Sequence, residues 1–223
     1  NNNKQTKKQM AASAGTTKAK SKTARVLLVC CGHPKEDVEF DLVRDEAASV
    51  LMEMRQCLLE DYRLDPESVV LMNEASPEEV VSEIEKPGHL FLVALGHGGC
   101  NKLGNELEPH WLRGHRIAVP KRDPTDAEAV WLQLPRGKLT EEMLRTACLG
   151  RPRKSRLLMF LGACFSGGFF DKWLPEFLVE DPEFTSTFNF PKIAAITTAN
   201  KRCQAGSWSW YELLRTLRSP AGS

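Results

Sequence analysis

The sequence predicts an α/β protein, a three-layer α/β/α sandwich built around a mostly parallel central sheet. Short apolar runs alternate along the chain with longer segments of helical periodicity. The runs are apolar throughout, which is typical of strands that are covered on both faces. A helix between two strands carries the chain back across the sheet, so successive strands become parallel. In such sheets, functional residues gather beyond the carboxyl ends of the strands.

Five apolar segments are predicted to form the strands of this sheet. Each is short and is bounded by glycine, proline or polar turn residues. They cover residues 26–31, 65–72, 89–96, 156–163 and 190–200. Three of them end abruptly, in the sequences CCGH, LGHGG and GACFSGG. These three ends are therefore the first places to look for a functional site.

The first predicted helix covers residues 41–64. Its apolar residues recur at spacings of three and four, which is the pattern of an amphipathic helix. The residues of this stripe are Val43, Ala47, Val50, Met54 and Leu58.

Three further helices are predicted from signals at their starts or along one face. Residues 76–86 begin with Ser76 as N-cap, Pro77 in the first turn and Glu79 at the third position, which is a capping box. Residues 139–150 are capped by Thr140. Residues 206–218 form a closing helix with a predicted core stripe of Trp208, Trp210, Leu213, Leu214 and Leu217.

The chain is interpreted as one domain over residues 26–218, preceded by a tail. Residues 1–25 are rich in lysine and contain no acidic residue, which predicts a disordered basic tail. Residues 101–138 are polar and contain several prolines, so they are predicted to be loop-like, with an inserted loop at about 101–130.

Composition limits the classes of partner and the cellular compartment that the sequence supports. The formal net charge is +1, which gives no argument for a nucleic-acid partner. No apolar run is long enough to span a bilayer. The seven cysteines are an odd number, and several lie in apolar runs, which indicates reduced thiols in a cytoplasmic compartment. A homodimer or a larger assembly is left open.

Cys164 and His97 each close a predicted strand, and together they suit acyl transfer. An imidazole near a thiol promotes the thiolate, which is the nucleophile. Gly98 and Gly99 carry no side chain, so a substrate can come close to the backbone there. The N–H groups of Gly98 and Cys164 could form an oxyanion hole for a tetrahedral intermediate.

The order of these residues along the chain excludes two classes of enzyme. Papain-like enzymes and α/β-hydrolases place their histidine after the nucleophile. All five histidines of this chain precede Cys164. His33, which also follows a strand, is a rival to His97 as the base. Histidine before cysteine, each at the end of a buried strand, leaves the caspase-type arrangement.

The chain resembles the caspase-haemoglobinase family of cysteine peptidases, and it is most similar to the legumain and GPI-transamidase branch. HLFLVALGHGG resembles the family's strand that ends in His-Gly, and LLMFLGACFSGGFF its strand that ends in Ala-Cys-x-Ser-Gly. VRDEAASVLMEM is similar to legumain's first helix, and IAAITTANKRCQAGS to its strand and substrate-lining loop.

The resemblance implies a cysteine endopeptidase that acts on protein or peptide substrates. His97 and Cys164 would be the dyad, and Gly98 would help to hold the oxyanion. Arg44 matches a basic residue of the S1 pocket, and the loop from Thr197 to Ser207, including Thr198, would line the substrate cleft. No cofactor or metal is expected.

Two departures from the family pattern affect these expectations. Family members usually have Glu, Asp or Gln two residues before the cysteine, where this chain has Gly162. Arg44 without a nearby acid would favour an acidic or neutral P1 side chain. The interval from His97 to Cys164 also exceeds the ~50 residues that are typical of caspases.

The sequence leaves two other functions open, and it does not favour a zinc site. The scaffold could be a catalytically inactive interaction module, or it could be a transamidase that passes the acyl group to an amine. His33, His97, Cys31 and Cys100 could supply four zinc ligands, but the chain has no paired C-x-x-C spacing, so zinc is not expected.

Overall fold

A five-stranded parallel sheet forms the centre of the molecule. The computed structural model describes residues 24–34, 41–100, 130–152, 155–170, 192–199 and 206–219. The strand order is β2-β1-β3-β7-β8, and all four neighbouring pairs are parallel. The strands are β1 (Ala24–Cys31), β2 (Val69–Met72), β3 (His89–Gly96), β7 (Arg156–Ala163) and β8 (Lys192–Thr197).

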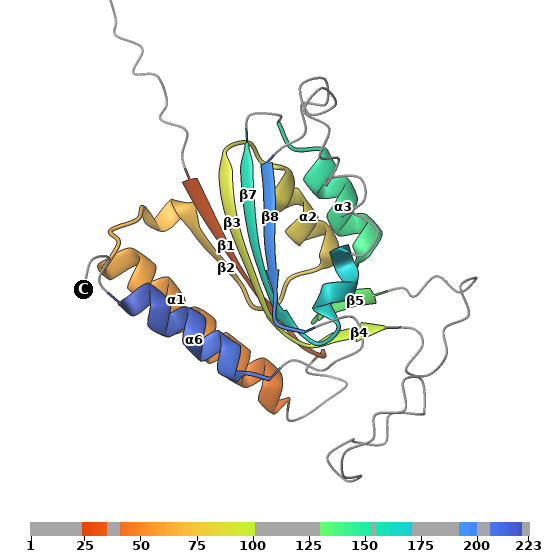
Figure 1. The fold of residues 1–223 in the computed structure, drawn as a ribbon, viewed down its shortest axis with the longest axis horizontal. Helices are drawn as coiled ribbons and strands as arrows, with labels where there is room; N and C mark the ends of the chain where they lie inside the picture. The colour runs from red at the N-terminus through yellow and green to blue at the C-terminus, as the bar shows by residue number, and fades with distance from the viewer. Residues whose placement is uncertain are drawn as a thin grey trace, which may run out of the picture.

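Helices cover both faces of this sheet, as Figure 1 shows. Helices α1 (Leu42–Glu60) and α6 (Trp208–Arg218) lie side by side on one face, and α2 (Pro77–Glu85) and α3 (Glu141–Leu149) lie on the other. Successive strand residues point to opposite faces. In β1, Leu27 and Val29 therefore join the core under α2 and α3, whereas Val26 and Leu28 join the core under α1 and α6. The predicted α/β sandwich is confirmed.

The helix-start signals in the sequence are confirmed. The Ser76 hydroxyl accepts a hydrogen bond from the Glu79 N–H, and the Glu79 carboxylate accepts one from the Ser76 N–H at 2.8 Å. The Thr140 hydroxyl caps α3 by accepting from the Met143 N–H at 3.3 Å. Each cap satisfies N–H groups that the helix itself leaves without a partner.

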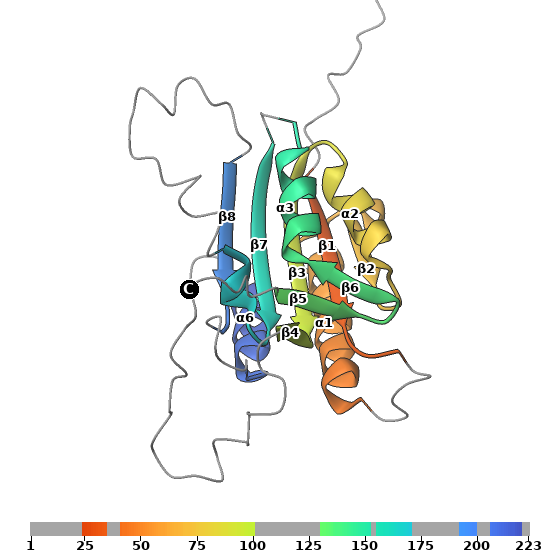
Figure 2. The same cartoon turned by 90° about the vertical axis from the view of Figure 1, so that its right-hand side faces the viewer.

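The prediction of a loop over residues 101–138 is wrong at its C-terminal end. Strands β4 (Gly98–Cys100), β5 (Val130–Leu134) and β6 (Gly137–Thr140) form a small antiparallel sheet. Figure 2 shows β5 and β6 beside α3, on the face of the large sheet that α2 and α3 cover. Val130, Leu132 and Leu134 are buried at alternate positions, and Pro135 lies in the turn. Aliphatic residues occupy every second position over 130–134 in the sequence, which is the pattern of a half-buried strand, whereas the nearby prolines favour a loop. The inserted loop itself lies outside the described residues.

One boundary and two stripe residues also differ from prediction. Strand β1 begins at Ala24, so the last residues assigned to the tail belong to the sheet, and residues 1–23 lie outside the described part. In α1, Val43 is exposed and Arg44 is buried. In α6, Trp208 is 71% exposed, whereas Trp210 is 2% exposed. A helix buries a narrow stripe, and residues two apart do not share it.

Two short 3-10 helices complete the described elements, η1 (Pro66–Ser68) before β2 and η3 (Ser166–Phe170) after β7. Within the described ranges, no helix has the length and apolar character that crossing a membrane requires.

Replacing Gly96 by alanine should strongly destabilise the fold. Gly96 has a φ of +123°, and a Cβ there would collide with the Cys31 carbonyl oxygen of the neighbouring strand. We expect the Gly96→Ala variant to lose at least about 2 kcal/mol of unfolding free energy, because a strained backbone residue alone costs 1–3 kcal/mol. Urea denaturation monitored by circular dichroism measures this.

Gly150→Ala is the matched control. Gly150 has a φ of −67°, and the nearest atom to a Cβ there is the Thr146 oxygen at 3.4 Å. Its unfolding free energy should stay within about 1 kcal/mol of the unmodified protein. Equal effects of the two substitutions would contradict the argument from backbone crowding.

Candidate active site

The strand register brings His97 and Cys164 to the same edge of the sheet. Cys31 pairs with Gly96, and Gly96 pairs with Ala163, so the three central strands end level. His97 and Cys164 each follow the last paired residue of neighbouring strands. Adjacent strands lie about 4.8 Å apart. The backbone positions of the two residues are therefore neighbours, as the sequence predicted.

Gly98 lies directly against the backbone of Cys164. A Cβ on Gly98 would collide with the Cys164 carbonyl oxygen and would lie 3.3 Å from the Ala163 side chain. Only a residue without a side chain fits this approach. The close contact holds the start of β4 against the turn that carries the thiol.

The N–H of Gly98 points away from β5. Neighbouring residues of an antiparallel pair alternate between hydrogen-bonded and non-hydrogen-bonded positions. The Gln133 N–H donates to the His97 carbonyl at 3.0 Å, and Gly98 is the next residue along the same ladder, opposite Leu132. Gly98 thus holds a non-hydrogen-bonded position, and its N–H is directed away from β5.

Cys164 stands at a sharp, strained turn. Its side chain is half-buried, and it comes directly after the end of β7. The next residue, Phe165, has a φ of 59° although it is large and not glycine. Bulky residues adopt this left-handed conformation only where the surrounding structure imposes it. Phe165 is buried in the core under α2 and α3, which holds the turn in place.

Asp41 is the hydrogen-bonding partner of His97, and sequence reasoning missed it. Its Oδ1 lies 2.9 Å from His97 Nε2 and also accepts from the Arg44 N–H at 2.9 Å. Its Oδ2 accepts from the His33 N–H at 3.0 Å. The only signal in the sequence was that Asp41 is the first residue of the helix predicted over residues 41–64, and aspartate is favoured at helix N-caps.

Asp41 remains ionised because its hydrogen bonds outweigh its burial. Burial alone would raise the pKa of this carboxyl group, but the N–H groups of Arg44 and His33 and the His97 ring lower the pKa below its ordinary value. A carboxylate fixed in this way orients the His97 ring.

His33 lies on the other side of the same carboxylate. Its ring centroid is 4.8 Å from that of His97, and the two rings are tilted by 50°. His33, Asp41 and His97 each present one potential ligand atom, and these atoms all lie within 4.8 Å of one another. His33 thus neighbours the predicted base, but it follows β1, which does not pair with β7, whereas His97 follows β3, which does.

The guanidinium of Arg44 is held by the protein. Arg44 is 5% exposed, its Nη1 donates to the His33 carbonyl at 3.0 Å, and its Nη2 pairs with Asp45 at 3.3 Å. Its aliphatic stem packs against Gly32. In this structure Arg44 supports the loop that carries His33, and its charge is not presented openly to a ligand.

Trp210 fills the space beside Gly162. Its Nε1 donates to the Gly162 carbonyl at 2.8 Å, and a Cβ on Gly162 would approach this indole and Leu95 to 2.6 Å. A larger residue at position 162 has no room. The indole of α6 therefore occupies the volume that the acid or amide of the family pattern would need.

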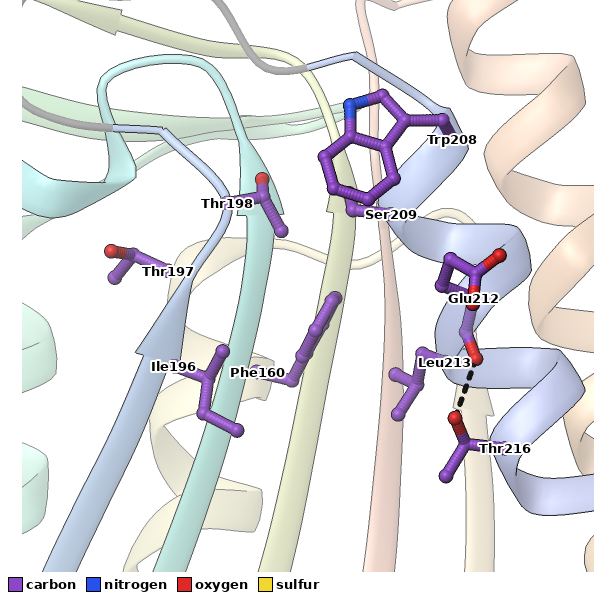
Figure 3. A pocket seen from close by; sticks show the side chains of 9 residues that line it. All are labelled: Phe160, Ile196, Thr197, Thr198, Trp208, Ser209, Glu212, Leu213 and Thr216. Atoms are coloured by element: carbon purple, nitrogen blue, oxygen red, sulfur yellow. Dashed lines mark hydrogen bonds between the residues drawn. The ribbon is translucent and has the colours of Figure 1, made fainter.

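Thr198 lines a groove between the edge of the sheet and α6. The groove has a volume of about 380 Å³, and Figure 3 shows its lining side chains. They are Phe160, Ile196, Thr197, Thr198, Trp208, Ser209, Glu212, Leu213 and Thr216. The Thr198 N–H donates to the Leu161 carbonyl at 3.2 Å. Ser207 stands at the N-cap of α6 without a side-chain capping bond. The rest of the predicted cleft loop, residues 200–205, lies outside the described part.

Four cysteines behave as buried apolar residues, as predicted. Burial raises the pKa of the Cys30 and Cys148 thiols to about 12 and that of Cys57 to about 11. Burial also raises the pKa of Cys31 well above its ordinary value. A thiol with a raised pKa forms little thiolate, so these four are poor nucleophiles. Cys203 lies outside the described residues.

Comparisons with known proteins identify no family for this chain. No family model matches the chain, and no curated protein matches it. A protein of Geobacter sulfurreducens with a crystal structure is similar over 88% of this chain and 89% of its own, with 14% sequence identity and a TM-score of 0.46.

Removing the indole N–H of Trp210 should lower the unfolding free energy of the protein. In the Trp210→Phe variant the buried Gly162 carbonyl loses its partner, which costs about 1–3 kcal/mol before the smaller ring is considered. Trp208→Phe, at an exposed position of the same helix, should change the unfolding free energy by less than about 0.5 kcal/mol. Chemical denaturation of both variants tests this, and similar losses would show that the hydrogen bond is unimportant.

Proposed function

We propose that the protein is a cysteine endopeptidase of the caspase-haemoglobinase type, with Cys164 as nucleophile and His97 as base. The observation that carries the proposal is the level ending of β3 and β7. Because these strands end level, the backbone of His97 lies beside that of Cys164. His97 has a carboxylate partner, and Cys164 stands on a strained turn. Such a nucleophile, base and orienting group is the usual arrangement for covalent acyl transfer.

The proposed reaction starts with transfer of the thiol proton to His97. The Cys164 sulfur attacks the peptide carbonyl carbon, and the electron pair of the C=O bond moves to oxygen. The N–H groups of Gly98 and Cys164 hold this oxyanion. His97 then gives its proton to the leaving amine as the C–N bond breaks. Water, deprotonated by the same imidazole, hydrolyses the thioester and frees the enzyme.

Asp41 has a positioning role in this proposal. His97 is oriented through the nitrogen that faces Asp41, so its other ring nitrogen is left to exchange protons with the sulfur and the leaving group. The carboxylate also stabilises the imidazolium that forms in each proton transfer. The Oδ1 atom that contacts His97 also accepts the capping bond from the Arg44 N–H, so the dyad is tied to the start of a long, well-packed helix.

The P1 preference follows from the closed space at Gly162. The indole of Trp210 excludes a carboxylate at position 162, so no acidic floor is available to bind a basic P1 side chain. Arg44 is buried beside the His33 loop, with its guanidinium held by the His33 carbonyl and Asp45, so it adds positive charge near the site without contacting the substrate. We propose a neutral or acidic P1 residue for these reasons. The groove that includes Thr198 would receive the peptide on the other side.

The compartment is proposed to be reducing, such as the cytoplasm. Cys30, Cys31, Cys57 and Cys148 are buried thiols outside any disulfide. A substrate protein or peptide is the only partner that the proposed chemistry requires.

A peptidyl acyloxymethyl ketone should label the protein at Cys164. Cys164→Ala should abolish both labelling and peptide hydrolysis, and His97→Gln should lower kcat by at least about a hundredfold, the usual contribution of a general base. Cys100→Ser is the matched control, since Cys100 is a half-buried thiol on β4, and it should keep full activity. Peptide mapping by mass spectrometry identifies the labelled residue.

The same assay separates the alternatives. A folded protein that neither reacts at Cys164 nor cleaves any member of a peptide library would be an interaction module instead. Aminolysis that outpaces hydrolysis when an amine is added would indicate a transamidase.

Asp41→Asn should lower kcat more than it changes KM. Asparagine keeps the helix cap but removes the charge that stabilises the imidazolium, so kcat should fall by more than about tenfold. A loss of stability with an unchanged kcat would reduce Asp41 to a structural cap.

A further inference from the structure

We propose that His33, Asp41 and His97 form a binding site for a divalent transition-metal ion, best suited to Zn²⁺. The three side chains come from three separate segments, the turn after β1, the N-cap of α1 and the end of β3. Their ligand atoms already lie within 4.8 Å of one another.

The spacing requires only small side-chain movements. Zinc bonds to nitrogen and carboxylate oxygen are about 2.0–2.2 Å long, which puts tetrahedral ligand atoms roughly 3.3 Å apart. His97 Nε2 and Asp41 Oδ1 are 2.9 Å apart, slightly closer than this. The remaining contacts, up to 4.8 Å, close by rotation of the His33 side chain, whose ring is already 4.8 Å from that of His97.

The backbone around the site is already fixed. The His33 N–H donates to Asp41 Oδ2, and the His33 carbonyl accepts from Arg44 Nη1, so both sides of its peptide group are held. His97 is fixed by its N–H bond to the Cys31 carbonyl at 3.1 Å. A site held before the metal arrives loses little conformational freedom on binding.

The charge and the ligand types point to a transition metal. Two neutral imidazoles and one carboxylate carry a single negative charge, and the adjacent Arg44 cation is paired with Asp45. Imidazole nitrogen suits Zn²⁺, Co²⁺ or Ni²⁺, whereas Ca²⁺ and Mg²⁺ prefer oxygen ligands. Three protein ligands leave a fourth position for water, which is typical of sites that exchange their metal or use it.

Occupancy would stop the proposed peptidase chemistry, and this consequence rests on the proposed function. A metal bound at His97 Nε2 displaces the proton from that nitrogen and leaves the ring proton on Nδ1. The imidazole then has no lone pair with which to take the thiol proton, so zinc acts as a reversible inhibitor. The binding measurement below does not depend on peptidase activity, so the two proposals can fail separately.

The test is competition for Zn²⁺ between the full-length protein and a chromophoric chelator under reducing conditions. The unmodified protein should bind one Zn²⁺ per chain at this site. His33→Asn and Asp41→Asn should each weaken binding by at least tenfold, because even loss of a second-shell partner costs about 10–100-fold. Asparagine preserves the cap at position 41, so the fold is kept.

His89→Asn is the matched control and should bind zinc normally. His89 lies at the opposite end of β3 and accepts a hydrogen bond from the Arg156 N–H through Nδ1. Equal zinc affinities in the unmodified protein and the three variants would overturn the proposed site. Zinc binding that is lost when cysteines are changed to serine, but kept in His33→Asn, would also overturn it. Where peptidase activity is present, the His33→Asn variant should also need at least tenfold more Zn²⁺ for half-inhibition.

Discussion

The crowding of backbone at the carboxyl end of β3 is the constraint on which the rest of the site depends. Gly96 lies so close to the Cys31 carbonyl, and Gly98 so close to the Cys164 carbonyl, that neither position admits a side chain. The chain leaves the large sheet at Gly96 with a positive φ and enters the small antiparallel sheet at Gly98. His97 stands between these two contacts. Its position is consequently fixed by close-packed backbone on both sides, which is more rigid than a surface loop.

Asp41 connects this rigid edge to the helical layer. One carboxylate caps α1, holds the His33 loop and contacts the His97 ring. Three backbone or ring donors keep it charged although it is almost fully buried, because hydrogen bonds to an anion compensate for lost hydration. The arrangement means that the start of α1 cannot move without moving the imidazole. Stability and the geometry of the site are therefore coupled through a single side chain.

Much of the architecture could be predicted from local sequence patterns, and the parts that could not were contacts between distant segments. Five strands, four helices and the caps of two of these helices, Ser76 and Thr140, follow from apolar runs, periodicity and residue type. The neighbouring positions of His97 and Cys164 were predicted from two strand ends, but the contact of Gly98 with the Cys164 backbone was not. The hairpin at residues 130–140 was missed because Pro135 suggested a loop, although its turn is where proline is tolerated.

Asp41 and Trp210 were missed as site residues because their partners, His97 and Gly162, lie far away in sequence. Trp208 and Trp210 are indistinguishable by residue type, and only packing decides which one is buried.

The bond from the Trp210 indole to the Gly162 carbonyl gives the C-terminal helix a role in the order of assembly. During synthesis, β3 and β7 leave the ribosome before α6, so the strand that carries the thiol exists for a time with its outer face open to water. The turn at Cys164 and Phe165 gains its full support only when the last helix docks. A nascent chain thus contains β3 and β7 before it contains the indole that pairs with the Gly162 carbonyl, and the packing around the turn at Cys164 is completed only after α6 has been synthesised.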